Sequence, residues 1–294
     1  MSRTTKIGKI STNYKYSRIA MKKIAIILSL FPFLICCGLA NATASQKRLP
    51  GESYQDAVKR IINNKPQNEL KMLIARGTPY SKKVSLQKID YSTVPKVSSY
   101  DEMTNMFNLI RDTRFLYSPD KPDFQRRISW LYPDDGCFAR AALSRIKLDS
   151  EHFVIPAKIF VFGDLEMQTP YSSEGTVSWW YHVSAVVNYM GTIYVLDPAA
   201  KPEGPMLIDD WYNKIGIMDK MEAVVCNPYT YDPFDRCYDA TNKTDNKALN
   251  DQLKYLDKEW VRIESLGFDP SVLLGDNPPW IGDMRNSTLL SYKS

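Results

Sequence analysis

The sequence predicts an α+β fold in which a helix packs on an antiparallel sheet. Residues 136–148 form an alanine-rich segment with helical character, and strand-like segments follow at 157–163, 179–189 and 192–197. Strands joined by short connections pair in antiparallel order, and a neighbouring helix covers one face of their sheet. The 294 residues, of which 44% are hydrophobic, allow one such domain.

The first 44 residues have the pattern of a secretory signal peptide. Two lysines precede an apolar run at 24–39, and small residues follow it. This order of a basic, an apolar and a small-residue region is typical of a cleaved export signal, for which Met21 is a possible start. We therefore expect an exported protein, periplasmic or secreted, whose mature chain begins near Thr43 or Ser45.

The charge of the mature chain gives no reason to expect nucleic acid or anionic lipid as a partner. The first 44 residues hold seven basic side chains and no acidic one, so 38 basic residues become 31 against 33 acidic ones, a net charge of −2. A nearly neutral protein has no electrostatic reason to bind nucleic acid. The apolar run is short for a membrane span, so we expect no stable membrane association after cleavage. A retained anchor, or a lipid on Cys36 or Cys37, is the less favoured alternative.

Two helices are expected before the central region. Residues 45–92 are polar and charged, with apolar residues at helical intervals over 54–76 and an interruption before Pro66. We interpret residues 45–92 as an N-terminal extension or pro-segment, and residues 93–294 as the catalytic domain. The second helix is expected at 100–114, and a third long helix at 247–266.

The helix at 136–148 begins with a candidate nucleophile, Cys137. It follows the acidic turn Asp134-Asp135-Gly136. A thiol in the first turn of a helix lies at the positive end of the helix dipole, which lowers its pKa and favours the thiolate. Backbone N–H groups at the same place can hold a developing oxyanion. A buried structural cysteine is the alternative reading of this motif.

The strands at 179–189 and 192–197 supply a base and its partner. His182 alternates with the apolar residues of its strand, whereas the other histidine, His152, follows a polar loop sequence. If Met190-Gly191 is a two-residue hairpin turn, Asp197 is a diagonal neighbour of His182 on the same sheet face. We therefore predict that Asp197 orients His182, which acts as the base for the thiol.

Four sequence blocks resemble the protein-glutaminases, secreted bacterial enzymes that deamidate glutamine side chains in proteins. They are Tyr132-Pro133-Asp134-Asp135-Gly136-Cys137-Phe138-Ala139-Arg140-Ala141, Phe160-Val161-Phe162-Gly163-Asp164-Leu165, Trp179-Trp180-Tyr181-His182-Val183 and Leu196-Asp197-Pro198. The resemblance implies a transglutaminase-like (papain-like) core, with Cys137, His182 and Asp197 as the catalytic residues. It also implies substrates that are proteins or peptides with exposed glutamine, and a pro-segment over the active site.

Further candidates lie around this set. Tyr132, Asp135, Trp179 and Trp180 are the candidate substrate-binding residues. Cys226 and Cys237 are close together in one loop of an exported chain, so we expect a disulfide between them. Two histidines and scattered cysteines offer no cluster for a metal, and we expect no cofactor.

Three other functions stay open at this point. A transglutaminase or a cysteine peptidase would use the same three residues, because both also form an acyl-enzyme at cysteine. A secreted binding or toxin module would leave the three residues unused.

Overall fold

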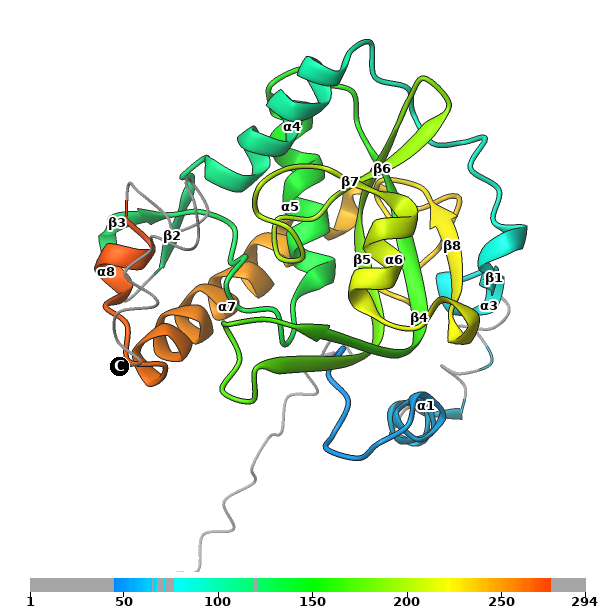
Figure 1. Ribbon diagram of the computed structural model, residues 1–294, viewed down its shortest axis with the longest axis horizontal. Coiled ribbons are helices and arrows are strands. Elements are labelled where there is room, and N and C mark those ends of the chain that lie inside the picture. The colour runs from blue at the N-terminus through cyan, green and yellow to red at the C-terminus, as the bar shows by residue number, and fades with distance from the viewer. Residues whose placement is uncertain (1–44, 65, 68–70, 72–76, 119–120, 276–294) are drawn as a thin grey trace, which may run out of the picture. The chain divides into compact units, whose positions relative to one another are not determined.

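A six-stranded antiparallel sheet forms the centre of the computed structural model, which describes residues 45–64, 66–67, 71, 77–118 and 121–275 (Figure 1). The strand order is β1-β8-β4-β5-β6-β7, and every neighbouring pair is antiparallel. The strands are β1 (Val84–Ser85), β4 (Ala157–Gln168), β5 (Thr176–Tyr189), β6 (Thr192–Leu196), β7 (Met206–Leu207) and β8 (Glu222–Cys226). The predicted α+β class with an antiparallel sheet is confirmed. The predicted signal peptide lies outside the described residues.

Helices cover both faces of this sheet (Figure 1). On one face, α4 (Tyr100–Asp112) and α5 (Cys137–Ser150) bury their apolar sides, and α7 (Asp245–Ser265) packs against α5. On the other face, α6 (Ile208–Ile215) places Trp211 among buried strand residues such as Val161. The two core layers follow from the strand period of two, which sends alternate side chains to opposite faces.

The remaining elements are short. They are α1 (Tyr54–Asn63), α3 (Pro79–Lys82), β2 (Leu116–Ser118), β3 (Lys121–Arg126), α8 (Pro270–Leu273) and the 3-10 turns Leu86–Lys88, Met218–Lys220 and Asn242–Thr244. The helix expected over 54–76 begins as predicted at Tyr54 but ends at Asn63. The two asparagines and the proline at position 66 disfavour its continuation. Most of its second part lies outside the described residues.

The hairpin between β5 and β6 has the predicted register. Tyr189 pairs with Thr192, and the turn residues Met190 and Gly191 have φ values of 53° and 88°, as a tight hairpin turn requires. The pairing runs only as far as Ala185 and Leu196. Beyond this point β5 continues to its start at Thr176, so its edge over 176–182 is not paired with β6.

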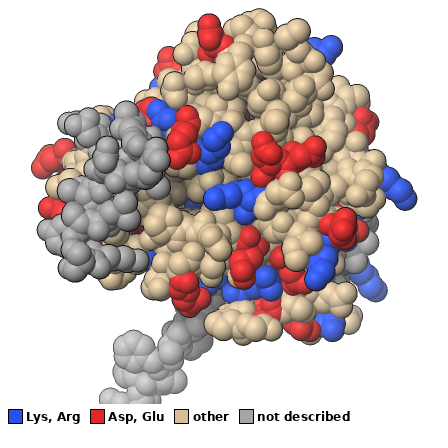
Figure 2. Space-filling model, in the orientation of Figure 1, with Lys and Arg blue, Asp and Glu red and all other residues tan. Residues whose placement is uncertain are grey.

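Part of the N-terminal extension is built into the core. Strand β1 pairs with β8 at the edge of the sheet, and Leu86 is buried among residues of β4, β5 and β8. Acidic and basic side chains are interspersed on the face drawn in Figure 2, in keeping with a nearly neutral domain. Among the described helices, none has both the length and the apolar character to cross a bilayer.

Candidate active site

Cys137 is the first residue of α5, and a left-handed glycine holds it there. Gly136 has φ 86°, and a Cβ on it would come within 2.7 Å of the Tyr255 ring, so a larger residue fits neither the backbone nor the space. The Gly136 N–H donates to Asp135 Oδ1 at 2.8 Å. The turn therefore fixes the position of the Cys137 N–H at the N-terminus of the helix.

His182 and Asp197 form a buried pair across the hairpin. The His182 Nε2 lies 2.8 Å from Asp197 Oδ2, and both side chains are 3% exposed. Trp211 of α6 donates its indole N–H to the same Oδ2 at 2.9 Å. Burial raises the pKa of Asp197, but the charge of His182 and the hydrogen bonds from His182 and Trp211 outweigh it and hold this pKa below its usual value. The carboxylate is therefore suited to stabilise an imidazolium.

Trp179 fixes the plane of the imidazole. Its ring stacks on His182 with the centroids 4.7 Å apart and the planes 9° from parallel, and its Nε1 donates to Pro133 O at 2.9 Å. With Nε2 turned to Asp197, the other ring nitrogen is buried and has no hydrogen-bond partner among the described residues. The Cys137 thiol lies against the N–H of Val183, the residue after His182. The structure thus joins His182 to Asp197 and brings the thiol beside their strand, without a hydrogen bond between thiol and imidazole.

Residues 45–48 lie along the free edge of β5; we call them the covering segment. Lys47 pairs with Trp179 in antiparallel fashion. The Trp180 N–H donates to Gln46 O at 3.0 Å, and the Arg48 N–H donates to Ser178 O at 3.0 Å. The segment therefore adds a short strand to β5 where β6 has ended.

The Gln46 side chain reaches the start of α5. Its Oε1 accepts from the Cys137 N–H at 2.8 Å, and the residue is 0% exposed. Its side-chain NH₂ is buried and has no partner among the described residues. A primary carboxamide thus lies at the helix N-terminus with its oxygen on the backbone of the candidate nucleophile.

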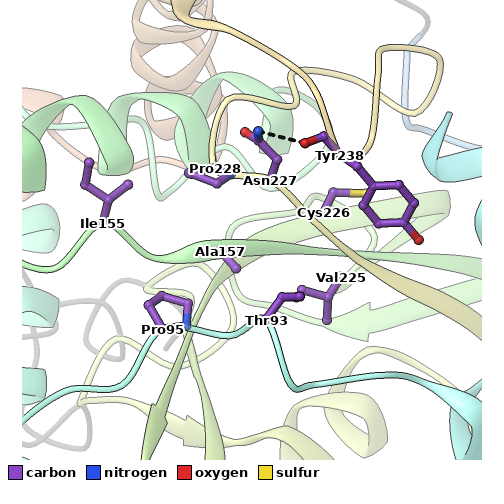
Figure 3. A pocket seen from close by; sticks show the side chains of 9 residues that line it. All are labelled: Thr93, Pro95, Ile155, Ala157, Val225, Cys226, Asn227, Pro228 and Tyr238. Atoms are coloured by element: carbon purple, nitrogen blue, oxygen red, sulfur yellow. Dashed lines mark hydrogen bonds between the residues drawn. The ribbon is translucent and has the colours of Figure 1, made fainter. Parts of the chain in front are cut away.

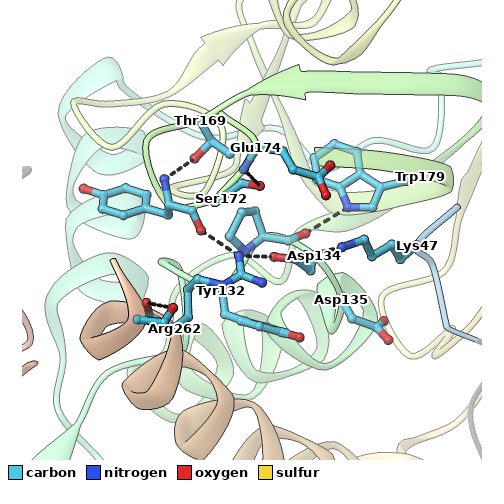
Figure 4. Close-up of polar contacts among 12 residues, drawn as sticks. Lys47, Tyr132, Asp134, Asp135, Thr169, Ser172, Glu174, Trp179 and Arg262 are labelled. Atoms are coloured by element: carbon cyan, nitrogen blue, oxygen red, sulfur yellow. Dashed lines mark hydrogen bonds and ion pairs between the residues drawn. The ribbon is translucent and has the colours of Figure 1, made fainter. Parts of the chain in front are cut away.

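Two aspartates before α5 hold the covering segment (Figure 4). Lys47 Nζ lies 2.8 Å from Asp134 Oδ1, and Arg262 lies 2.6 Å from the other oxygen of the same carboxylate. The Gln46 N–H donates to Asp135 Oδ1 at 3.3 Å. Asp135, predicted to bind substrate, therefore contacts the backbone of a glutamine.

The thiol itself differs from the prediction. Burial raises the pKa of Cys137 to about 12, and the nearby Arg140 offsets only part of this effect. The helix N-terminus was expected to lower this pKa, but a thiolate without water costs more free energy than the helix dipole returns. The sequence-based prediction of a reactive thiolate is wrong for this covered state.

The three candidate catalytic residues of this site lie within a segment that matches a known protein family. Residues 103–215, which include Cys137, His182, Asp197 and Trp211, match the family model Gln_deamidase_2, described as glutaminase. The match covers 113 of the 294 residues, so it shows a similarity of this segment to the glutaminase family.

The solved structures that are similar to this chain are distant from it. An NMR structure of protein-glutaminase from Chryseobacterium proteolyticum is 23% identical over 65% of this chain and 95% of that one, with a TM-score of 0.41. A crystal structure of pro-protein-glutaminase is 22% identical over 63% of this chain and 66% of that one, with a TM-score of 0.42. A crystal structure of the A47Q2 mutant of pro-protein-glutaminase is 22% identical over 55% of this chain and 61% of that one, with a TM-score of 0.40. This chain therefore spans less than two thirds of the length of that protein. The curated proteins gave no match.

Two further aromatic residues predicted to bind substrate have different surroundings in this site. Trp180 is fully buried and donates its indole N–H to Ser45 O at 2.8 Å, so it contacts the covering segment. Tyr132 is half-buried, stacks on Tyr255 at 6.1 Å and lies under the Arg262 guanidinium. Trp180 therefore lies at the site in this structure, whereas Tyr132 packs beside it.

Sequence reasoning missed three site residues: Gln46, Trp211 and Arg140. Trp211 supports Asp197 from α6, a helix that was not predicted. Arg140 is buried one turn into α5, where it donates to the carbonyls of Tyr132 and Asp135 at 2.9 and 2.7 Å. Its position three residues after Cys137, on the same helix face, was the available signal.

The disulfide and a pocket beside it lie apart from these residues. Cys226 and Cys237 form a disulfide that closes the loop after β8. Cys226 also lines a pocket of about 380 Å³ between β4, β8 and the loop before α4, with Pro95 and Tyr238 at its wall (Figure 3). None of Cys137, His182 and Asp197 lines that pocket. Within the described residues, no cluster of three potential metal ligands occurs.

Proposed function

We propose that this protein is an exported protein-glutaminase that hydrolyses the side-chain amide of protein-bound glutamine to glutamate and ammonia. Cys137 is the nucleophile, His182 the base and Asp197 the residue that orients the base, on a transglutaminase-like core. Proteins and peptides with exposed glutamine are the substrates, and the N-terminal extension acts as a pro-segment.

One observation carries this proposal: the chain's own Gln46 presents its carboxamide to Cys137. The carboxamide oxygen accepts from the Cys137 N–H at 2.8 Å, where an oxyanion would be stabilised in an acyl transfer. The site therefore accommodates the functional group of a glutamine side chain. The glutaminase family match over 103–215 supports the same chemistry.

Cys137 and His182 have separate roles in the proposed reaction. His182 Nδ1 takes the thiol proton, and the Cys137 sulfur attacks the amide carbon, whose oxygen is held by the Cys137 N–H. The carbon–nitrogen bond breaks, and the protonated imidazole gives its proton to the departing ammonia. A water molecule, deprotonated by His182, then hydrolyses the thioester. The thiol must turn from Val183 toward Nδ1 for the first step, because the two groups are not hydrogen-bonded in the covered state.

The backbone geometry favours a deamidase over a peptidase. The Gln46 carbonyl accepts from the Trp180 N–H, so the main chain lies along β5 while only the side chain reaches Cys137. A peptidase would present a main-chain carbonyl to the nucleophile instead. A transglutaminase shares the acylation step and differs in the acceptor, which is an amine in place of water.

Mass spectrometry of a treated protein substrate tests the function. Casein-like substrate incubated with a labelled primary amine should release ammonia and gain about 1 Da at glutamines, without new chain termini. The Cys137→Ser variant should give no product. Amine adducts would identify a transglutaminase, and new chain termini would identify a peptidase. The absence of any Cys137-dependent product would indicate a non-catalytic module.

Export is tested on the protein itself. The exported chain should begin near Thr43 or Ser45, as its N-terminal sequence would show.

A further inference from the structure

The covering segment binds the site in the way a substrate would. Ser45 and Gln46 are held through their carbonyls by Trp180, Gln46 is held through its N–H by Asp135, and Lys47 is held by Asp134. These contacts leave the Gln46 side chain directed at the start of α5, with its oxygen on the Cys137 N–H. The fully buried carboxamide has a hydrogen-bonded oxygen and an NH₂ with no hydrogen-bond partner in the part of the chain that the structure describes.

We propose that Gln46 is an internal substrate, which Cys137 deamidates to glutamate within the same chain, and that the new charge loosens the covering segment. This inference rests on the proposed function, because it uses the same nucleophile and base. It goes beyond that function by assigning a modification site and a single self-limiting turnover before any external substrate binds.

The internal reaction has the same balance as the external one. The Cys137 sulfur bonds to the Gln46 side-chain carbon, the carbon–nitrogen bond breaks, and ammonia leaves with the proton that His182 took from the thiol. Water then cleaves the thioester: its oxygen stays on the side chain, one of its protons returns the sulfur to a thiol, and the other leaves the new carboxylic acid and converts the released ammonia to ammonium. No oxidant, metal or second chain is needed.

The product fits the buried site less well than glutamine does. One oxygen of a glutamate at this position keeps the hydrogen bond from the Cys137 N–H, and the other takes the place of the NH₂, which has no hydrogen-bond partner among the described residues. Asp135 accepts from the Gln46 N–H, and Asp135 and Asp197 both act electrostatically on the neighbouring thiol, so the new carboxylate lies near two others. Arg140 and the N-terminus of α5 offset part of this repulsion, but the burial of one more carboxylate is strongly disfavoured. Release into water removes that cost.

Fragmentation mass spectrometry of the full chain tests the modification. We expect glutamate at position 46 in the wild-type protein, glutamine there in the Cys137→Ser variant, and an unmodified Gln252 in both. Gln252 is a suitable control because it is equally buried but donates to Ser129 away from the site. Glutamate in both proteins would indicate spontaneous deamidation and overturn the inference.

The same samples separate the two proposals. Glutamine at position 46 in an enzyme that deamidates added protein overturns the internal reaction and leaves the proposed function standing. Glutamine at position 46 together with no activity on added protein removes both.

The loosening is tested by alkylation of Cys137. The Gln46→Glu variant carries the product charge from the start, and the Gln46→Asn variant is a neutral control with a shortened amide. We expect Cys137 in Gln46→Glu to be alkylated about tenfold faster than in Gln46→Asn, because charge rather than shape drives release. Equal rates in the two variants would contradict this part of the proposal.

Discussion

The covering segment and the His182–Asp197 pair both lie against β5, but they are held in different ways. His182 and Asp197 are enclosed by Trp179 and Trp211 and are 3% exposed. The covering segment is attached by two main-chain hydrogen bonds, by hydrogen bonds that involve the Trp180 indole, the Gln46 side chain, the Arg48 side chain and Asp135, and by a lysine that is 45% exposed. The first arrangement is part of the core, whereas the second can be exchanged for another extended chain without unpacking it.

The two arrangements control different properties of the site: the His182–Asp197 pair controls its reactivity, and the covering segment controls access to Cys137. The imidazole and carboxylate are already oriented, so little reorganisation is needed before the reaction. The thiol is the group that the cover suppresses, because burial raises its pKa to about 12. We therefore expect changes around Asp197 to alter turnover, and changes around residues 45–48 to alter access to Cys137.

The largest effect is expected from Asp197→Asn. An amide can still hold the imidazole but cannot stabilise its charged form, and in a related triad this change costs on the order of 10⁴ in turnover. The unfolding temperature should stay close to that of the wild type. Trp211→Phe is the matched control: it removes only the indole N–H that supports the carboxylate, and should cost about tenfold. Near-wild-type turnover in Asp197→Asn would mean that another residue orients His182.

Two truncations compare the removable and the built-in parts of the N-terminal extension. A chain that begins at Leu49 should fold normally and expose Cys137. A chain that begins at Thr93 also loses β1 and Leu86, and loss of one buried leucine alone costs about 2–5 kcal/mol. Denaturant unfolding should therefore show a large loss of stability only for the second chain. Equal stability of the two would show that β1 contributes little to the sheet.

The pH dependence of alkylation measures the cover directly. In the covered protein the thiolate fraction is small at neutral pH and grows as the pH rises toward the raised pKa of about 12. The alkylation rate should therefore increase about tenfold for each pH unit from pH 7 to 10. In the chain that begins at Leu49 the rate should level off at lower pH, since water reaches the thiol. Parallel profiles in the two proteins would contradict the attribution of this pKa to burial.

The smallest effect is expected from Lys47→Ala. The lysine is partly exposed, and Asp134 keeps Arg262 as a second partner, so the lost ion pair is worth at most about 1 kcal/mol. Alkylation of Cys137 should rise by no more than about fivefold, a factor that corresponds to this free energy. A much larger increase would show that Lys47 is the main attachment of the covering segment.

The sequence predicted those parts of the site that depend on local pattern. The turn at Met190-Gly191 sets the register of β5 and β6, and the register places Asp197 beside His182. The helix from Cys137 follows from its alanines and the preceding glycine. These relations span few residues, so periodicity and turn chemistry were sufficient.

The parts that were missed depend on contacts far apart in the chain. Gln46 meets Cys137 across 91 positions, and no local pattern indicates that a polar residue near the N-terminus will be buried. Trp211 belongs to an eight-residue helix whose role follows from its packing on the sheet. The pKa of Cys137 was misjudged for the same reason, because the helix N-terminus is local and the burial is not.

The early end of β6 has a consequence for the choice of target. Under the proposed function, the free edge of β5 would accept a substrate chain only where several of its residues are extended and their amide groups are unpaired. A glutamine inside a helix or a central strand of a folded protein must first open locally, at a free energy set by its own surroundings. Deamidation rates along one folded target should therefore rank its glutamines by ease of local opening, with loops and frayed ends ahead of regular structure.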